Sequence, residues 1–208
     1  MILLHGLART QRSLAGLRRH LEAAGFPTWS HTYPSRKLSI VELAEDIARR
    51  ALAEHPRARF MAVTHSMGGV LVRHMTHLLP WRGVVMLAPP NRGSRVALAF
   101  RDRPFYRWFY GPAGQDLTRP ADWPPPPHPF GVIAGTRAIS ANPLGWLTRG
   151  LGAMPRGVPS DGVVAVEETK LEGMADFATI DTSHTFIMGN PTVREWVVHF
   201  LEHGRFKP

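Results

Sequence analysis

The chain has 208 residues, no cysteine, and a formal net charge of +9 at pH 7. The length suits one domain, and the lack of cysteine excludes disulfides, thiolate zinc sites and cysteine nucleophiles. No apolar run reaches the roughly 18 residues that cross a bilayer. The N-terminus shows no signal-peptide pattern, so the default expectation is a cytoplasmic protein, although a chain trimmed after export would look the same.

The positive charge has two interpretations. A basic surface attracts nucleic acid, anionic lipid or acidic polymer. However, three lysines accompany twenty-two arginines, a balance typical of a GC-rich genome, and no basic run is longer than two residues. Without a clustered basic face or a known motif we expect no nucleic-acid binding, and weak association with anionic lipid surfaces stays open.

Predicted strands and helices alternate along the chain. In chain order they are a strand (2–5), a helix (13–24), a strand (28–33), a helix (39–54), a strand (59–65), a helix (67–78), three strands (83–89, 130–136, 177–182) and a closing helix (192–203). The second helix opens on a capping box, Ser39 with Glu42. This order predicts one α/β domain, 1–208, with a mostly parallel sheet flanked by helices on both faces. Such sheets bind ligands beyond the carboxyl ends of their strands.

One segment, 91–128, breaks the alternation. It holds the aromatic stretch "FRDRPFYRWFYGPAG" and then "DWPPPPHP". The aromatic stretch predicts a helix that either packs on the sheet or forms a partial lid over the site. The four prolines at 124–127 predict a stiff polyproline II spacer, and a proline-motif docking site is the less favoured alternative.

A strand-to-helix turn at 63–69, "VTHSMGG", presents Ser66. Such a turn exposes the serine hydroxyl and aims the next residue's N–H into a site. Gly68 and Gly69 provide the small residues that the tight turn needs, but Thr64 stands where the Gly-x-Ser-x-Gly pattern has its first glycine. The alternative is a serine that merely caps the following helix.

A nucleophilic serine needs a base and a group that orients the base, in the chain order serine, acid, histidine. His184 fits the base, because it follows the last predicted strand and precedes the last helix. His128 lies in the proline run, and His199 and His203 lie inside the closing helix. His65 adjoins the serine, but a neighbour on a turn points elsewhere.

Asp161 is the favoured acid, because "VPSDGVV" places it in a loop beyond strand 130–136, with a glycine beside it that leaves room for the carboxylate. Asp181 lies in or beside the last strand and is the less favoured candidate, and Asp176 lies at that strand's far end. A turn aspartate that bonds its own backbone is the plain alternative for Asp161.

The oxyanion of a tetrahedral intermediate needs two donors, which are typically backbone N–H groups. One is expected from Met67, the residue after the serine. The other is expected from Leu7 in "HGLAR" (5–9), since Gly6 lets the backbone turn sharply after the first strand. A plain strand-to-helix turn is the alternative at 5–9.

Together, "LLHGLART", "VTHSMGG", "APPNRGS", "SDGVV" and "SHTF" resemble the α/β-hydrolase superfamily, within it the small single-domain esterases and lipases of bacteria. The resemblance covers essentially the whole chain. It implies Ser66 as nucleophile, Asp161 as acid, His184 as base, and the N–H groups of Leu7 and Met67 as oxyanion donors. It also implies a sheet truncated at its start, so the first strand is short or an N-terminal extension is missing.

Two departures from the family pattern, Thr64 at the elbow and Ala8 after Leu7, leave the pocket shape open. The expected activity is hydrolysis of short- to medium-chain carboxylic esters, by a monomer without metal or cofactor, on a small-molecule or lipid ester. The alternatives are a true lipase acting on triglycerides, an acyltransferase or thioesterase with the same triad, and a binding module that leaves the triad unused.

Overall fold

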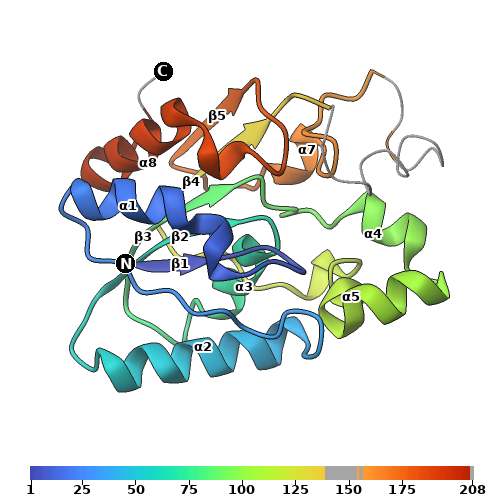
Figure 1. Cartoon of the computed structure of the whole chain (residues 1–208), viewed down its shortest axis with the longest axis horizontal. Helices are drawn as coiled ribbons and strands as arrows, with labels where there is room; N and C mark the ends of the chain where they lie inside the picture. Colours follow the sequence, from blue (N-terminus) through green and yellow to red (C-terminus); the bar gives the residue numbers. More distant parts are fainter. Residues whose placement is uncertain (139–153, 155–156, 207–208) are drawn as a thin grey trace.

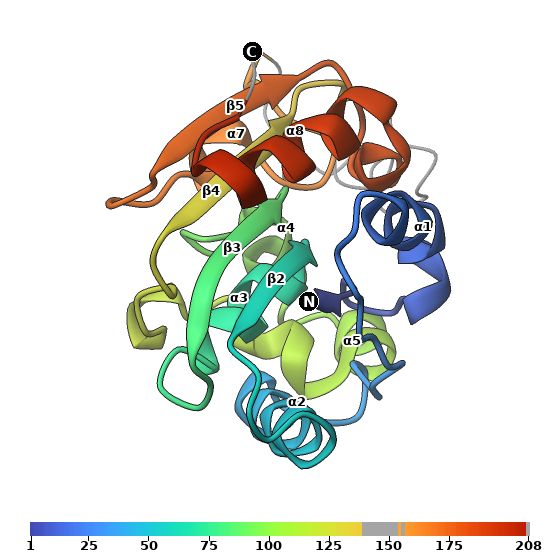
Figure 2. The same cartoon turned by 90° about the vertical axis from the view of Figure 1, so that its left-hand side faces the viewer.

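The computed structural model describes residues 1–138, 154 and 157–206. Its centre is a five-stranded sheet in which every neighbouring pair is parallel and the strands lie in chain order (Figure 1). The strands are β1 (Ile2–Leu4), β2 (Phe60–His65), β3 (Trp81–Leu87), β4 (Phe130–Gly135) and β5 (Asp176–Ile180). Because all five run the same way, their carboxyl ends meet at one edge of the sheet, and Figure 2 shows the twist of this sheet.

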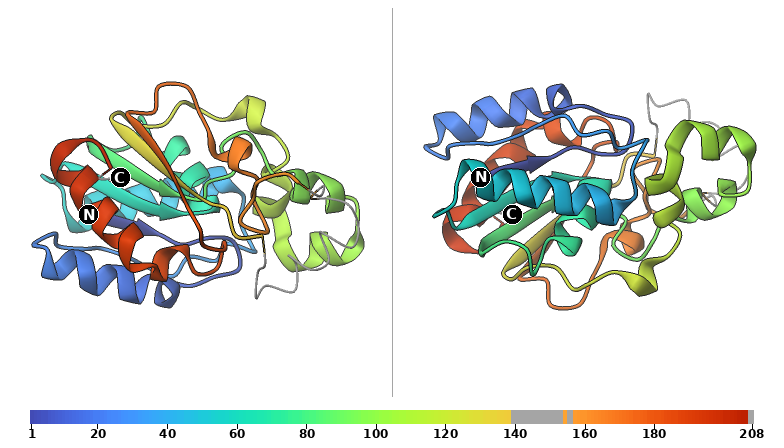
Figure 3. Two further views of the ribbon diagram at one scale, coloured as in Figure 1. Left: turned by 90° about the horizontal axis from the view of Figure 1, so that it is seen from above. Right: turned by 90° about the horizontal axis from the view of Figure 1, so that it is seen from below.

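Helices cover both faces of the sheet. One face carries α1 (Ala15–Ala23), which follows the short helix η1 (Gln11–Leu14), together with α8 (Pro191–His203); the other carries α2 (Ile40–Glu54) and α3 (Met67–His74) (Figures 1 and 3). Alternate residues of a strand therefore enter different cores. Leu3 packs with the α1 and α8 side, and Ile2 and Leu4 with the α2 and α3 side. The predicted α/β architecture is confirmed.

Beyond the carboxyl edge of the sheet lies a lobe made of α4 (Arg95–Phe100) and α5 (Pro104–Asp116), at the right of Figure 1. The short helices η2 (Pro120–Asp122), α7 (Val166–Thr169) and η3 (Ile187–Gly189) lie in loops between the larger elements. Gly111 kinks α5 with φ of 62°, and a Cβ there would lie 1.9 Å from the carbonyl oxygen of Arg36. Only glycine fits this left-handed, closely approached position.

The proline run after the lobe is bound along α3. Arg73 of α3 donates to the carbonyl oxygens of Trp123 (3.2 Å), Pro124 (2.7 Å) and Asn91 (2.8 Å), and Thr76 donates to that of Pro125 (2.8 Å). Prolines have no N–H of their own, but their carbonyls anchor this segment to the helix. No helix in the described part of the chain is both long and apolar enough to cross a membrane.

The predicted strand at 28–33 is wrong. This segment meets β1 only around Trp29, whose N–H donates to Met1 and whose carbonyl accepts from Leu3. At the next position the Ser30 hydroxyl donates to the Leu3 carbonyl (3.2 Å), and the chain then turns away to bring Tyr33 against the loop after β1. Helix α3 is also shorter than predicted, because a turn follows His74.

Candidate active site

Ser66 lies in a strained turn between β2 and α3. Its φ of 55° and ψ of −124° are in a region that L-residues other than glycine rarely adopt. Two backbone hydrogen bonds stabilise this strained conformation. The Ser66 N–H donates to the carbonyl of Leu87 on β3 (2.9 Å), and its carbonyl accepts from the N–H of Gly69 (2.9 Å).

The two glycines after Ser66 let α3 lie directly against the sheet. A Cβ on Gly68 would lie 2.6 Å from the Leu4 carbonyl oxygen, and one on Gly69 would lie 2.7 Å from Cβ of Pro89. Thr64 is fully buried, yet the same Cβ on Gly69 would be 3.5 Å from its Oγ1, an ordinary contact. The turn therefore accepts a threonine where the usual pattern has glycine, because the helix side supplies the space.

Three of the predicted side chains form one hydrogen-bonded chain. The Nε2 of His184 is 3.0 Å from Oγ of Ser66, and its Nδ1 is 2.6 Å from Oδ2 of Asp161. The other carboxylate oxygen of Asp161 accepts from the N–H groups of Val163 (2.9 Å) and Val164 (2.7 Å). An ionised Asp161 requires Nδ1 to carry the imidazole proton, which leaves Nε2 free to accept from the serine hydroxyl.

The fold explains why these side chains meet. Ser66 follows β2, Asp161 lies in the loops after β4, and His184 follows β5, so all three reach the same edge of the sheet. Gly135 ends β4, and a Cβ there would lie 2.8 Å from Cβ of Asp161 and 2.5 Å from the carbonyl of Thr182. The acid and histidine loops thus close over this glycine, and the N–H of His184 donates to the Asp161 carbonyl (3.0 Å).

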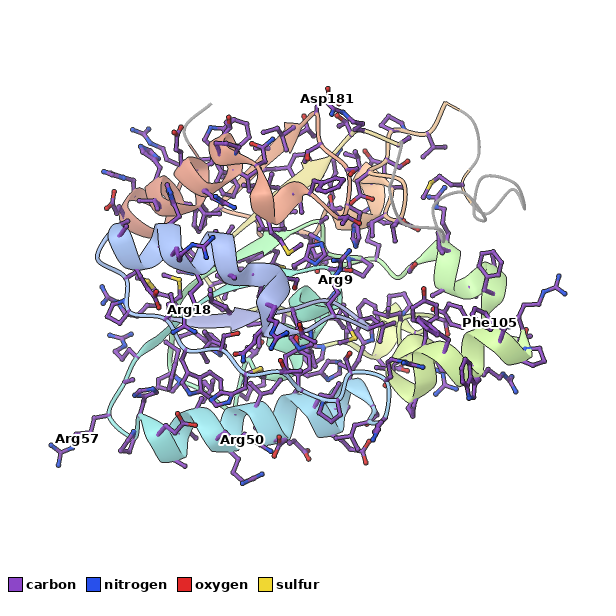
Figure 4. The ribbon with its side chains drawn as sticks, in the orientation of Figure 1. Arg9, Arg18, Arg50, Arg57, Phe105 and Asp181 are labelled. Atoms are coloured by element: carbon purple, nitrogen blue, oxygen red, sulfur yellow. The ribbon has the colours of Figure 1, made fainter. Side chains whose placement is uncertain are left out.

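The rival residues lie elsewhere. Asp181 is exposed at the top of Figure 4, where it pairs with Arg137 at 2.7 Å. Asp176, at the start of β5, accepts from the N–H of Phe206 (2.6 Å). His199 and His203 stack on each other on α8, with ring centroids 4.3 Å apart. None of these four residues is hydrogen-bonded to Ser66 or His184 in the described structure.

His65, set aside in the sequence, lies at the site. It does not contact the serine as a base. Its ring packs on that of His184 with centroids 4.7 Å apart, and its Nε2 donates to the His184 carbonyl oxygen (3.0 Å). Burial lowers the pKa of His65 well below its ordinary value, so the ring is neutral. His65 therefore supports the backbone of His184, a contact that no local pattern could reveal.

The loop after β1 is also held rigidly. The buried His5 stacks on Tyr33 with centroids 3.7 Å apart, donates from Nδ1 to the Gly6 carbonyl (2.9 Å) and accepts at Nε2 from the Tyr33 N–H (3.3 Å). Burial lowers the pKa of His5 to about 4. Ala8 adopts a left-handed φ of 56°, and its N–H donates to the Ser35 hydroxyl (3.0 Å). The sequence did not point to His5, Tyr33 or Ser35 in these roles.

The two predicted oxyanion donors are the N–H groups of Met67 and Leu7. Met67 is the first residue of α3, where a helix leaves N–H groups unpaired. Leu7 lies in the loop after β1 and lines the same cavity as Ser66. Neither N–H donates a hydrogen bond to another described residue. No described group of three or more His, Asp or Glu side chains is arranged to hold a metal ion.

Comparison with known proteins gives a fold. No family model matches the chain, and no curated protein does. Among solved structures, the mature Bacillus licheniformis lipase BlEst2 superimposes with a TM-score of 0.70 at 16% identity, over 97% of this chain and 89% of that one. Phospholipase PlaB from Legionella pneumophila superimposes with a TM-score of 0.70 at 17% sequence identity, over 97% of this chain. The metagenomic carboxyl esterase MGS0156 superimposes with a TM-score of 0.70 at 19% sequence identity, over 89% of this chain. The chain has the α/β-hydrolase fold.

This chain spans 58% of PlaB and 64% of MGS0156, so it corresponds to part of those larger proteins. At such low sequence identities the similarity establishes the fold alone. The expected α/β-hydrolase resemblance is confirmed at that level.

Ser66 and His184 line a cavity of about 370 Å³. Residues of the loop after β1 and of the lobe of α4 and α5 both line this cavity. Most of the lobe's contribution is apolar or aromatic: Val96, Ala97, Tyr106, Phe109, Tyr110 and Leu117. Segment 91–128 thus both packs into the core, through buried Tyr106, and lines the cavity. The partial lid expected for segment 91–128 stays a prediction.

Proposed function

We propose that the protein is a serine carboxylic ester hydrolase. One observation carries the proposal: the unbroken hydrogen-bonded chain from Asp161 through His184 to Ser66 at the wall of an apolar cavity. A serine hydroxyl is a weak nucleophile, and this arrangement is what activates it. Structural neighbours that are a lipase, a phospholipase and a carboxyl esterase support the same class of reaction.

In the proposed mechanism, His184 takes the hydroxyl proton as Ser66 attacks the ester carbonyl. Asp161 holds the imidazole in the required tautomer and stabilises its charged form. The N–H groups of Leu7 and Met67 bind the oxyanion. His184 then gives the proton to the departing alcohol, and water cleaves the acyl-enzyme by the same route.

The cavity volume supports a proposal for the size of the substrate. A volume of about 370 Å³ lies at the small end of the range for ligand pockets. With walls that are mainly apolar, it suits acyl chains of short to medium length.

The test is a panel of p-nitrophenyl esters of graded chain length, assayed with wild type, Ser66→Ala and His184→Ala. Each variant should lose on the order of 10⁴ to 10⁶ in turnover. Activity that survives either substitution nearly intact, in a folded protein, contradicts the proposal.

A second candidate is action at a lipid surface. It is favoured by large apolar side chains on the lobe that point into solvent: Leu98 is 51%, Phe105 64% and Trp108 73% exposed (Figure 4 labels Phe105). Such a patch is typical of a surface that meets a membrane or another apolar partner. Rates measured below and above the solubility limit of a triglyceride decide between the two. A sharp jump favours the lipase, and smooth saturation favours the soluble-ester hydrolase.

A further inference from the structure

Arg9 places a positive charge in the wall of the catalytic cavity. It lies in the loop after β1, between the sheet and the α4–α5 lobe (Figure 4), and is partly buried. Its Nη2 donates to the Thr185 hydroxyl at 3.0 Å. Because Thr185 directly follows His184, the guanidinium is held beside the histidine that protonates the leaving group in the proposed mechanism.

No carboxylate side chain neutralises Arg9. Every Asp and Glu of the chain lies among the described residues, and none is within ion-pair distance of it. The described residues that line the cavity include no acid, and Asp161 is committed to His184. Burial lowers the pKa of Arg9, but a guanidinium stays charged at neutral pH. A partly desolvated cation without a counter-charge is costly, and an anionic ligand would offset that cost.

A second depression extends the positive surface. Its volume is about 500 Å³, and its lining includes Arg36, Lys37 and Trp108. Arg9 and Ala8 line both this depression and the catalytic cavity, so Arg9 stands at their junction. The residues described around the second depression also include no acid. The charged side chains in the described lining of this depression, those of Arg9, Arg36 and Lys37, are therefore all positive.

Resting on the proposed ester hydrolysis, we propose that the substrate carries an anionic group, a carboxylate or a phosphate, on its alcohol portion. Arg9 binds this group. The alcohol portion is assigned because the departing oxygen must lie at His184, next to Thr185 and Arg9. A carboxylate and a phosphate both accept the paired N–H donors of a guanidinium. Arg9 uses one of its five N–H donors within the described structure, on Thr185, which leaves donors for such a pair.

The test measures how fast matched butyryl esters release butyric acid. The two esters of each pair differ in the charge of the alcohol portion. The phosphate pair is 1-butyrylglycerol 3-phosphate with uncharged 1-butyrylglycerol. The carboxylate pair is the butyryl ester of 4-hydroxybutyrate with that of 4-hydroxybutyramide. Arg9→Gln removes the charge, and Arg12→Gln is the matched control, since Arg12 is exposed and does not line the cavity.

We expect wild type to prefer the charged member of at least one pair in kcat/KM, by about 10- to 100-fold, as one or two charge-assisted hydrogen bonds provide. Arg9→Gln should lower that ratio at least tenfold, while Arg12→Gln keeps it. The pair that shows the preference identifies the anionic group of the substrate as a phosphate or a carboxylate.

Two results would overturn the inference. One is wild type without a charge preference in either pair. The other is Arg9→Gln lowering charged and uncharged esters by the same factor, which would make Arg9 a support of the His184 loop through Thr185. Both outcomes keep Ser66-dependent hydrolysis, so they leave the proposed function standing. Absence of any hydrolysis that depends on Ser66 would instead overturn the proposed function and this inference with it.

Discussion

Replacing Asp161 by asparagine keeps the shape of the site but reverses its hydrogen bonding. The amide oxygen can still accept from the N–H groups of Val163 and Val164, which lie 2.9 and 2.7 Å from Oδ1. The amide NH₂ then faces Nδ1 of His184, where Oδ2 stood at 2.6 Å. The imidazole must accept there, so its proton moves to Nε2, and this nitrogen can no longer take the proton of Ser66. A change of this kind lowers turnover by about 10⁴, or roughly 5.5 kcal/mol of transition-state stabilisation.

The assay is kcat for a soluble butyrate ester, with urea unfolding to show that the variant is folded. Asp181→Asn is the matched control. Asp181 is 73% exposed and its pair with Arg137 lies at the surface, where such pairs contribute about 0–1 kcal/mol. This control should keep kcat within about twofold. The reasoning is refuted if folded Asp161→Asn retains more than a tenth of kcat, or if Asp181→Asn loses as much.

Three further predictions concern stability. Gly68→Ala would place a Cβ 2.6 Å from the Leu4 carbonyl oxygen, so its urea midpoint should fall by the equivalent of about 1–3 kcal/mol; an unchanged midpoint contradicts the close contact. Arg73→Met leaves three backbone carbonyls without their donor and should cost at least about 3 kcal/mol, whereas a loss below 1 kcal/mol argues against the anchoring role. Burial lowers the pKa of His5 to about 4. Below about pH 6.5 the unfolded chain therefore binds a proton at His5 that the folded chain does not bind. As the pH falls further, this residue lowers the free energy of unfolding by about 1.4 kcal/mol per pH unit. Urea titrations between pH 6.5 and 5 should therefore show a shallower decline for His5→Gln than for wild type, and equal slopes would count against a neutral, buried His5.

Much of the fold could be predicted because its signals are local. The capping box of Ser39 and Glu42 opens α2, as observed with reciprocal hydrogen bonds. Gly204 ends α8 in the left-handed conformation. The order of strands and loops was enough to expect Ser66, Asp161 and His184 at one edge of a parallel sheet, and the structure brings their side chains within hydrogen-bonding distance.

The remaining features depend on contacts between distant parts of the chain. The segment around Trp29 has residues that favour a strand, but it pairs with β1 at a single bridge, so tertiary geometry overrides propensity. Arg9 meets Thr185 only because both loops reach the same cavity. The support that His65 gives His184 likewise arises from packing between β2 and the loop after β5. Neither contact leaves a periodic or spaced pattern in the sequence.

The most direct test of the central claim is covalent labelling with a fluorophosphonate, read by intact mass and peptide mapping. Such a reagent reacts with a serine that a neighbouring base activates. We predict one adduct per chain, on Ser66, none on Ser66→Ala, and labelling slowed by orders of magnitude in His184→Ala. An adduct on another residue, or wild type that stays unlabelled while folded, would contradict the claim that Ser66 is the nucleophile.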